Sequence, residues 1–258
     1  TGPSRVRSVT TADGRTIGVG RALVAGGHLA QLAGMITGAE PSSDLLAARD
    51  AWRPGLSVLA VHAALRSNLA FGSAGIASTA AGYGTTDGMA RHLDRHSSGE
   101  LEADDPWLLV VNQTVVDPDR APDGATFKIL TIAPCQLSDG RPWAEVKDAY
   151  GERLVSRVRE RCSGLDADDI LFLRTESPID VADHNPHNLG GSCHGGEFLI
   201  GDRVVAGWMR HDTDVPGLFV TGATTHPGGS VSGRPGRNAA RAVLRSLGLD
   251  PAGVMGPS

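Results

Sequence analysis

The chain has 258 residues, 40% of them hydrophobic and 21% charged, which is enough apolar material to bury a core and argues against a disordered class. Twenty-four Lys and Arg against 29 Asp and Glu give a net charge of −5 without a basic block, which argues against nucleic acid or an anionic membrane surface as the main partner. No apolar run approaches the roughly 18–20 residues of a membrane span.

Strand signals dominate the first part of the chain. Two alternating runs flank Asp13-Gly14 and predict a hairpin, and residues 21–25 predict a buried strand that ends at Gly26-Gly27. Helices are expected over 28–36 and after the cap signal at 41–44. The next strand is predicted at 57–65. Residues 72–104, which are rich in small side chains, are expected to be mixed helix and loop.

The middle of the chain predicts an antiparallel sheet with a long helix. Residues 107–116 and 125–132 are β-branched runs joined by a rigid Pro- and Asp-rich turn, so the two strands should be antiparallel. A 3.6-residue apolar period with basic residues near its end predicts a helix over 143–161. A strand at 170–174 and a short helix that begins at Pro178 follow.

The last segment carries the strongest functional signal. Residues 218–222 predict a buried strand that ends on glycine, a loop of small residues spans 223–233, and Pro235 to Gly248 is punctuated as a helix. Strand, glycine-rich loop and helix bring backbone N–H groups and the positive end of a helix toward an anion or a polarised ring.

Other motifs are weaker. Gly18-x-Gly20 precedes its strand and lacks the third glycine of a dinucleotide fingerprint. Three widely spaced cysteines without a CxxC favour a reducing, cytoplasmic location over a disulfide framework. A possible metal site is formed by His184, His187, Cys193 and His194, but their spacing fits no common zinc pattern, so a polar loop is favoured there. Thr1 could be an N-terminal nucleophile, but the residues around it favour a flexible tail.

Residues 217–229, with Gly236-Arg237-Asn238-Ala239-Ala240, closely resemble the C-terminal signature of the phytoene-desaturase-like FAD oxidoreductases, whose fold is shared with the amine oxidases. The turn at 117–124, Thr175–Pro178 and the stretch from Gly190 to Gly195 also match that family. The likeness implies an α/β fold: the second part of a two-domain FAD-binding Rossmann-like flavoprotein, with an α+β, antiparallel-sheet substrate domain. Residues 1–40 and 205–258 are expected in the FAD-binding domain, and residues 41–204 in the substrate domain.

The resemblance also implies the site. Gly222 and Ala223 are expected beside the pyrophosphate or ribityl chain of FAD, and the loop from His226 to Ser232 along the isoalloxazine. The implied cofactor-binding residues are Gly222, Ala223, His226, Pro227, Gly228, Gly229, Ser230, Val231, Ser232, Ala25 and Gly26. His226, His194 and Asn188 are the candidate catalytic residues that line the cavity, and no metal is expected.

The family's GxGxxG segment is not present in this sequence. The chain is therefore expected to be a subunit or processed fragment of an FAD-dependent oxidoreductase that removes hydride from a C–H or C–N bond of a small or lipophilic organic substrate, with a second chain that supplies GxGxxG. A redox-neutral flavin-dependent isomerase and a non-catalytic subunit remain alternatives. Trp208-Met209-Arg210 departs from the Arg-Pro common in the family, so the substrate is left open.

Overall fold

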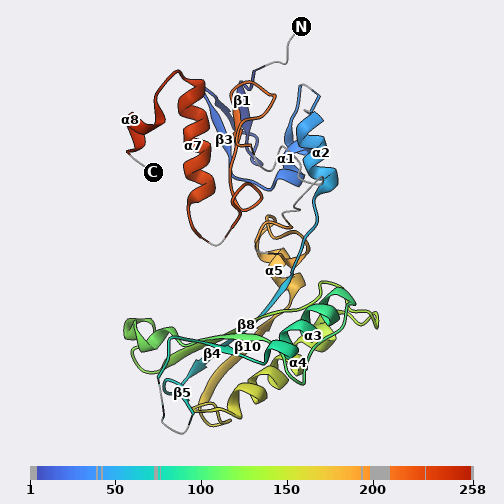
Figure 1. The fold of residues 1–258 in the computed structure, drawn as a ribbon, viewed down its shortest axis with the longest axis vertical. Coiled ribbons are helices and arrows are strands. Elements are labelled where there is room, and N and C mark those ends of the chain that lie inside the picture. Colours follow the sequence, from blue (N-terminus) through green and yellow to red (C-terminus); the bar gives the residue numbers. More distant parts are fainter. Residues whose placement is uncertain are drawn as a thin grey trace. The chain divides into compact units, whose positions relative to one another are not determined.

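The computed structural model describes residues 5–38, 40–41, 43–72, 75, 77–192, 194–197, 210–229 and 231–256. It divides into two compact units, each taken by itself below (Figure 1). Unit 1 contains Thr1–Gly55 and Cys193–Ser258, and unit 2 contains Leu56–Ser192. No helix among the described residues is long and apolar enough to cross a membrane.

Unit 1 is built on two small sheets and several helices. An antiparallel hairpin pairs β1 with β2, and β3 runs parallel to β11. The strands are β1 (Ser8–Thr10), β2 (Thr16–Gly18), β3 (Leu23–Ala25) and β11 (Leu218–Val220), and the helices are α1 (Leu29–Met35), α2 (Ser43–Ala51), α7 (Arg234–Ser246) and α8 (Pro251–Met255). The hairpin around Asp13-Gly14 and the strand–loop–helix order near the C-terminus agree with the sequence patterns.

The boundary between the units differs from the expected one at 40/41. Helix α2 belongs to unit 1 because Leu45 and Ala48 are buried in one cluster with Leu29, Leu32 and Val220. The second boundary falls at 192/193 rather than at 204/205. The sequence signals placed α2 in the other domain, but its apolar face is buried in unit 1, and unit 1 therefore extends past this helix.

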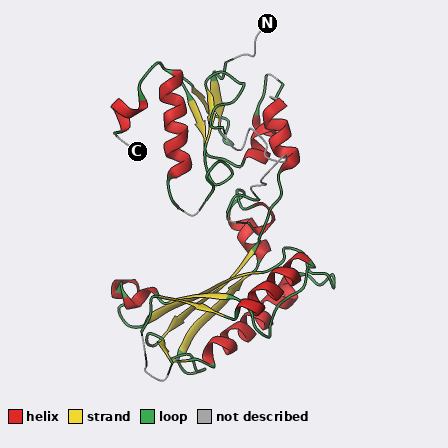
Figure 2. Ribbon diagram, in the orientation of Figure 1, coloured by secondary structure: helices red, strands yellow, loops and turns green. Residues whose placement is uncertain are grey.

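Unit 2 is a five-stranded antiparallel sheet of order β10-β4-β8-β7-β6, with the two longest helices of the unit, α3 and α4, together on one face (Figure 2). The sheet strands are β4 (Val58–Leu65), β6 (Ala80–Tyr83), β7 (Leu108–Val111), β8 (Ala125–Ile132) and β10 (Ile170–Glu176). The other elements are α3 (Thr86–Ser97), α4 (Trp143–Arg159), α5 (Pro178–His184), the small sheet of β5 (Ala70–Phe71) and β9 (Cys162–Ser163), and the 3-10 turns Gln113–Val115, Pro118–Arg120 and Leu189–Gly191. Strand β6 lies inside the stretch expected to be mixed helix and loop.

The core of unit 2 lies between the sheet and α4. Strand β8 alternates strictly, so that Ala125, Phe127 and Ile129 are buried on one face. The apolar stripe of α4 covers this face with Trp143, Val146, Tyr150, Leu154, Val155 and Val158. Both the alternation and the helical period were readable in the sequence, and the antiparallel pairing of β7 with β8 confirms the prediction made from the turn between them.

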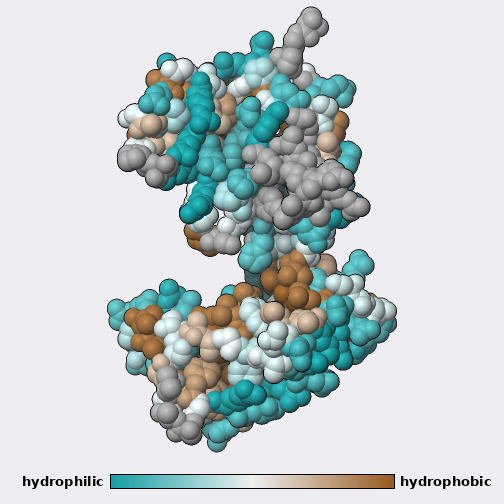
Figure 3. Space-filling model, viewed as in Figure 1, coloured by the Kyte–Doolittle hydropathy of each residue, from teal (hydrophilic) through white to brown (hydrophobic). Residues whose placement is uncertain are grey.

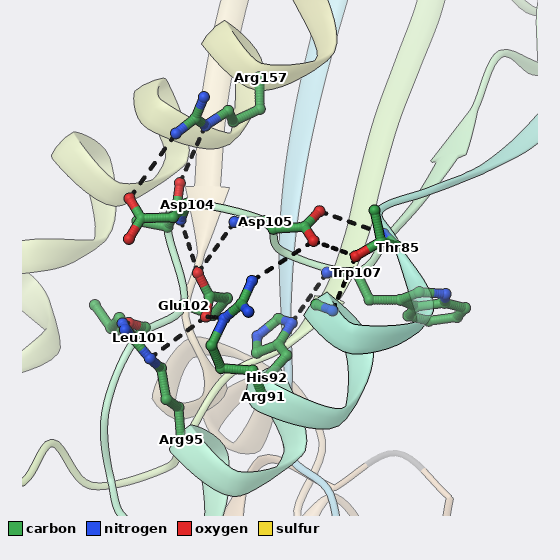
Figure 4. Close-up of polar contacts among 12 residues, drawn as sticks. Thr85, Arg91, His92, Arg95, Leu101, Glu102, Asp104, Asp105, Trp107 and Arg157 are labelled. Atoms are coloured by element: carbon green, nitrogen blue, oxygen red, sulfur yellow. Dashed lines mark hydrogen bonds and ion pairs between the residues drawn. The ribbon is translucent and has the colours of Figure 1, made fainter.

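A buried carboxylate ties α3 to the segment that follows it (Figure 4). Glu102 is fully buried and accepts hydrogen bonds from the backbone N–H groups of Asp104 (2.7 Å) and Asp105 (3.1 Å). The Nε atoms of Arg91 and Arg95 lie 3.1 and 3.4 Å from its Oε2. Burial raises the pKa of Glu102, but these hydrogen bonds and the Arg95 charge outweigh burial and lower it overall. The carboxylate is therefore ionised and fully satisfied.

Candidate functional site

The candidate site begins where the two parallel strands of unit 1 end. Leu218, Phe219 and Val220 of β11 are buried, and the Thr221 N–H donates to the Ala25 carbonyl at 2.9 Å. The carboxyl ends of β3 and β11 thus lie together, which is the edge where ligands bind in open α/β sheets. Gly222 follows at φ +109°, a conformation that side chains disfavour.

The loop after β11 is held by its own hydrogen bonds. The Thr225 N–H and Oγ1 both donate to the Gly222 carbonyl, at 3.1 and 3.0 Å. The Gly228 N–H donates to the Thr225 carbonyl at 2.7 Å, and Gly228 has φ +98°. The peptide bond between His226 and Pro227 is cis. Two consecutive turns, each needing a glycine, therefore shape this loop.

Glycines allow a second segment to pack closely against the loop. A Cβ on Gly195 would lie 2.2 Å from the Ala223 carbonyl oxygen, so only glycine fits there at φ +90°. A Cβ on Gly229 would lie 3.4 Å from the His194 carbonyl oxygen and 3.5 Å from the Ala223 Cβ. The Trp52 Nε1 donates to the Gly195 carbonyl at 2.8 Å and fixes the segment from the other side.

Buried polar side chains form hydrogen bonds that hold the loop in place. Thr224 is buried, and its Oγ1 accepts from the Leu29 N–H at 3.3 Å. The ring nitrogens of the buried His211 lie 3.0 Å from the Val220 carbonyl and 3.1 Å from the His226 carbonyl. The His226 carbonyl also accepts from the Asn238 Nδ2 at 3.3 Å. Of the described loop residues, His226 and Pro227 stay exposed.

Helix α7 starts directly after the loop. Its N-cap, Gly233, is in the left-handed region and gives no side-chain cap, and Pro235 stands in the first turn. Ser232 Oγ accepts from the Arg234 N–H at 3.3 Å. Val231 has φ +56° and a fully exposed side chain. Because Ser232 takes the Arg234 N–H and Pro235 has none, the first turn offers the Gly236 N–H and the positive end of the helix dipole near Val231 and Ser232.

Most predicted site residues come together in unit 1. Ala25 and Gly26 lie beside Thr221, where a Cβ on Gly26 would be 3.9 Å from the Thr221 Cγ2. Gly222, Ala223, His226, Pro227, Gly228 and Gly229 form the loop, and His194 packs on Gly229. The Asn188 Nδ2, in unit 2, donates to the Val181 carbonyl at 3.1 Å. Ser230 lies outside the described residues.

Several residues of the site gave no clear signal in the sequence. Thr224, Thr225 and His211 support the loop, but buried hydroxyls and a lone histidine are common in protein cores. Trp52 follows α2, which the sequence signals assigned to the other domain. Gly196, where a Cβ would lie 2.2 Å from the Trp52 Nε1, could have been found from its place beside the matched Gly195.

The metal candidates do not form a ligand set in the described part of the chain. The structure describes no group there of three or more His, Cys, Asp or Glu side chains placed to hold an ion. His184 Nε2 lies 3.8 Å from the Glu176 carboxylate, and burial lowers the pKa of His187. Cys193 lies outside the described residues.

The chain is similar to known oxidoreductases. It is 28% identical to a limonene dehydrogenase subunit of Castellaniella defragrans over 66% of this chain and 32% of that protein. It is 29% identical to a lycopene-forming phytoene desaturase of Pseudescherichia vulneris, over 55% of this chain and 29% of the relative. It is 31% identical to a neurosporene-forming phytoene desaturase of Rhodobacter capsulatus, over 52% of this chain and 25% of that protein. No family model matches the chain.

These matches confirm the resemblance to phytoene-desaturase-like oxidoreductases that the C-terminal motif indicated. The matched region spans about a third or less of the length of each relative. The observed mixed α/β architecture with an antiparallel sheet agrees with the expected fold class.

Proposed function

We propose that this chain is part of an FAD-dependent oxidoreductase that takes hydride from a C–H or C–N bond of an organic substrate. The observation that carries the proposal is the parallel β3/β11 pair, in which the carboxyl end of β11 leads into the glycine loop and the N-terminus of α7. The relatives named as a dehydrogenase subunit and as desaturases support an oxidoreductase of this type.

The residues of the loop fit a flavin nucleotide. Gly222 and Gly229 are half-buried and carry no side chain, as close approach of a pyrophosphate or a planar ring requires, while Gly228 is buried in the turn. Gly222 and Ala223 would hold the pyrophosphate or ribityl chain of FAD, and the backbone at Val231 and Ser232 would hold the part of the ring that gains negative charge on reduction. The α7 N-terminus would stabilise that charge by about 0.3–2 kcal/mol.

FAD supplies the hydride acceptor, and the chain supplies position and the exclusion of water. His226 is exposed at the turn of the loop, and the His194 backbone packs on Gly229, so these two histidines are proposed to line the substrate side of the ring. Asn188, in unit 2, stays a prediction from the sequence. None of the three needs to act as a base for hydride transfer to a flavin.

A second chain is proposed to complete the flavin domain. Among the described residues, β3 pairs with β11 alone, and β11 has on its other edge only an isolated bridge between Asp212 and Phe219. Parallel sheets are normally larger and buried on both faces, and open edges invite pairing with further strands. The relative from Castellaniella defragrans is named as one subunit of an enzyme, which favours a partner chain carrying the GxGxxG segment.

The substitution Gly229→Leu tests the role of the loop. A Cβ fits at 3.4 Å, but the larger side chain would occupy the surface along which the ring is proposed to lie. The folded complex with Gly229→Leu should contain less than a tenth of the wild-type flavin, measured by absorbance and by fluorescence of flavin released on denaturation. Gly34→Leu is the matched control, because Gly34 is exposed on α1 and a Cβ there would meet no heavy atom within 4 Å. Full flavin content in Gly229→Leu would indicate a loop that only supports the fold.

A further inference from the structure

Unit 1 contains a pocket of about 650 Å³ at the end of its strands that lies away from the glycine loop. Gly217 and Leu218, at the amino end of β11, form part of its wall, whereas Gly222 follows the carboxyl end of the same strand. The last turns of α7 form another part. A pocket of this volume has the size of a small-molecule site. Three arginines from three segments line it, namely Arg5, Arg21 and Arg245.

Positive charge gathers around this pocket although the chain as a whole is acidic. Unit 1 has twelve Lys and Arg against nine Asp and Glu, whereas unit 2 has twelve against twenty. Helix α7 contains four arginines and no acidic residue, and Figure 3 shows hydrophilic surface along this helix. The spacing of three, four and four residues places the arginines on one side of the helix, and their row ends in the pocket. The four are Arg234, Arg237, Arg241 and Arg245.

The backbone around Gly217 holds Arg5 in position. The Val6 N–H donates to the Pro216 carbonyl at 3.1 Å, and the Arg5 guanidinium donates to the Arg21 carbonyl. Gly217 has φ +81°, and a Cβ there would lie 3.3 Å from the Arg5 Nε, so the glycine lets the guanidinium lie close to the backbone. Because this wall of the pocket is ordered without a ligand, binding costs less conformational entropy.

The guanidinium groups are the free hydrogen-bond donors of the pocket. Those of Arg21 and Arg245 form no hydrogen bond or ion pair within the described part of the chain. The hydroxyls of Thr213 and Ser246 already donate to backbone carbonyls, at 2.9 and 2.7 Å. Asp212 is the single carboxylate among the described lining residues. Three guanidinium groups against one carboxylate favour a ligand with about two negative charges.

An apolar wall continues from the arginines. It includes Phe219 of β11 and Leu247, whose side chain is 36% exposed. The C-terminus of a helix disfavours anions, but the last carbonyls of α7 accept hydrogen bonds from the N–H groups of Leu247, Gly248 and Leu249 at 2.9–3.1 Å. The carbonyl groups of this turn are therefore satisfied within the chain.

We propose that this pocket binds a small organic phosphate, with the phosphate held by Arg5, Arg21 and Arg245 and the organic body on the apolar wall. A phosphate monoester carries about −1.5 to −2 charges at pH 7, and its oxygens match the paired N–H donors of a guanidinium group. This site is distinct from the proposed flavin loop, since it lies at the other end of β11. Binding here does not depend on FAD.

Isothermal titration calorimetry with 1-naphthyl phosphate tests the site in protein purified natively through this chain. The compound should bind saturably, and 1-naphthol, which lacks the phosphate, should bind at least about tenfold more weakly. Inorganic phosphate should compete with it but bind more weakly, because the naphthyl ring adds apolar contact. The affinity should decrease several-fold when KCl is raised from about 50 to about 300 mM, since exposed charges are screened by salt.

Three variants separate the pocket from general positive charge. Arg21→Gln and Arg245→Gln should each weaken the binding of 1-naphthyl phosphate at least about tenfold. Both side chains are exposed, so the variants should fold like the wild type, which circular dichroism checks. Arg15→Gln is the matched control and should bind like the wild type, because Arg15 is exposed in the β1–β2 hairpin and does not line the pocket.

No saturable binding, equal affinity for 1-naphthol, or an equal loss in Arg15→Gln and Arg245→Gln would each overturn the proposal. Binding to vesicles that contain phosphatidic acid without binding of 1-naphthyl phosphate would also overturn it, because the arginines would then recognise a lipid surface. Flavin absorbance is measured on the same samples, so a failure here is distinct from a failure of the proposed FAD function.

Discussion

Glu102→Gln is expected to destabilise unit 2 strongly. Glu102 is fully buried and accepts from two backbone N–H groups and from the guanidinium groups of Arg91 and Arg95. The amide of glutamine keeps one acceptor, but its N–H₂ group turns a donor toward donors. Loss of a charge-assisted hydrogen bond and one mismatched buried contact should lower the free energy of unfolding by about 2–4 kcal/mol at pH 7. The arginines are half-exposed and can be solvated, which limits the loss.

Glu160→Gln is the matched control for this prediction. Glu160 is exposed and lies 3.1 Å from the Arg157 guanidinium, so its removal should cost no more than about 1 kcal/mol. Urea unfolding of unit 2, followed by circular dichroism, compares the two variants. If Glu102→Gln proves no less stable than Glu160→Gln, the buried network does not hold α3 to its loop.

The same carboxylate predicts a pH dependence. Because the folded-state pKa of Glu102 is lowered, its stabilising effect is present above roughly pH 4.3, the ordinary value for glutamate, and is lost as pH falls through the folded-state value. The wild-type unfolding free energy should therefore decrease with acidification below roughly pH 4.3 more steeply than that of Glu102→Gln. Parallel pH profiles of the two proteins would refute the assignment.

Three further outcomes are expected. Gly195→Ala should lower the free energy of unfolding by about 2–5 kcal/mol, because its Cβ meets the Ala223 carbonyl. Gly248→Ala, at a similar φ but with no atom near its Cβ, should lower it by only about 1–2 kcal/mol, and equal losses in urea unfolding would contradict the close packing at Gly195. Val231→Gly should raise the free energy of unfolding by about 0.5–1 kcal/mol, because glycine adopts the positive φ of this position without strain and the valine side chain is exposed. A lower free energy of unfolding would argue against strain at Val231. Burial lowers the pKa of His92, so NMR titration should place it below roughly 6.5, the ordinary value for histidine. The free energy of unfolding should then decrease as the pH falls from roughly 6.5 through the folded-state pKa, and a pKa above roughly 6.5 would contradict the burial.

Much of the fold was predictable because local patterns agree with the tertiary structure. The alternation of β8, the apolar stripe of α4 and the punctuation of α7 each predicted the observed element. Strand β6 (Ala80–Tyr83) was not predicted, because its small residues carry little strand propensity and its pairing with β7 decides its conformation.

The candidate site was predictable only in part. Gly222 and Gly228 stand out in the sequence because few other residues adopt their conformations. The supports of the loop, such as Trp52 and His211, depend on contacts between segments far apart in the chain.

The central claim is that the loop from Gly222 to Ser232 binds FAD. The most direct measurement is the visible absorption spectrum, with intact mass, of the protein purified natively through this chain. We expect the bands of oxidised flavin together with a second polypeptide that carries GxGxxG. A folded, complete protein without flavin absorbance would contradict the claim.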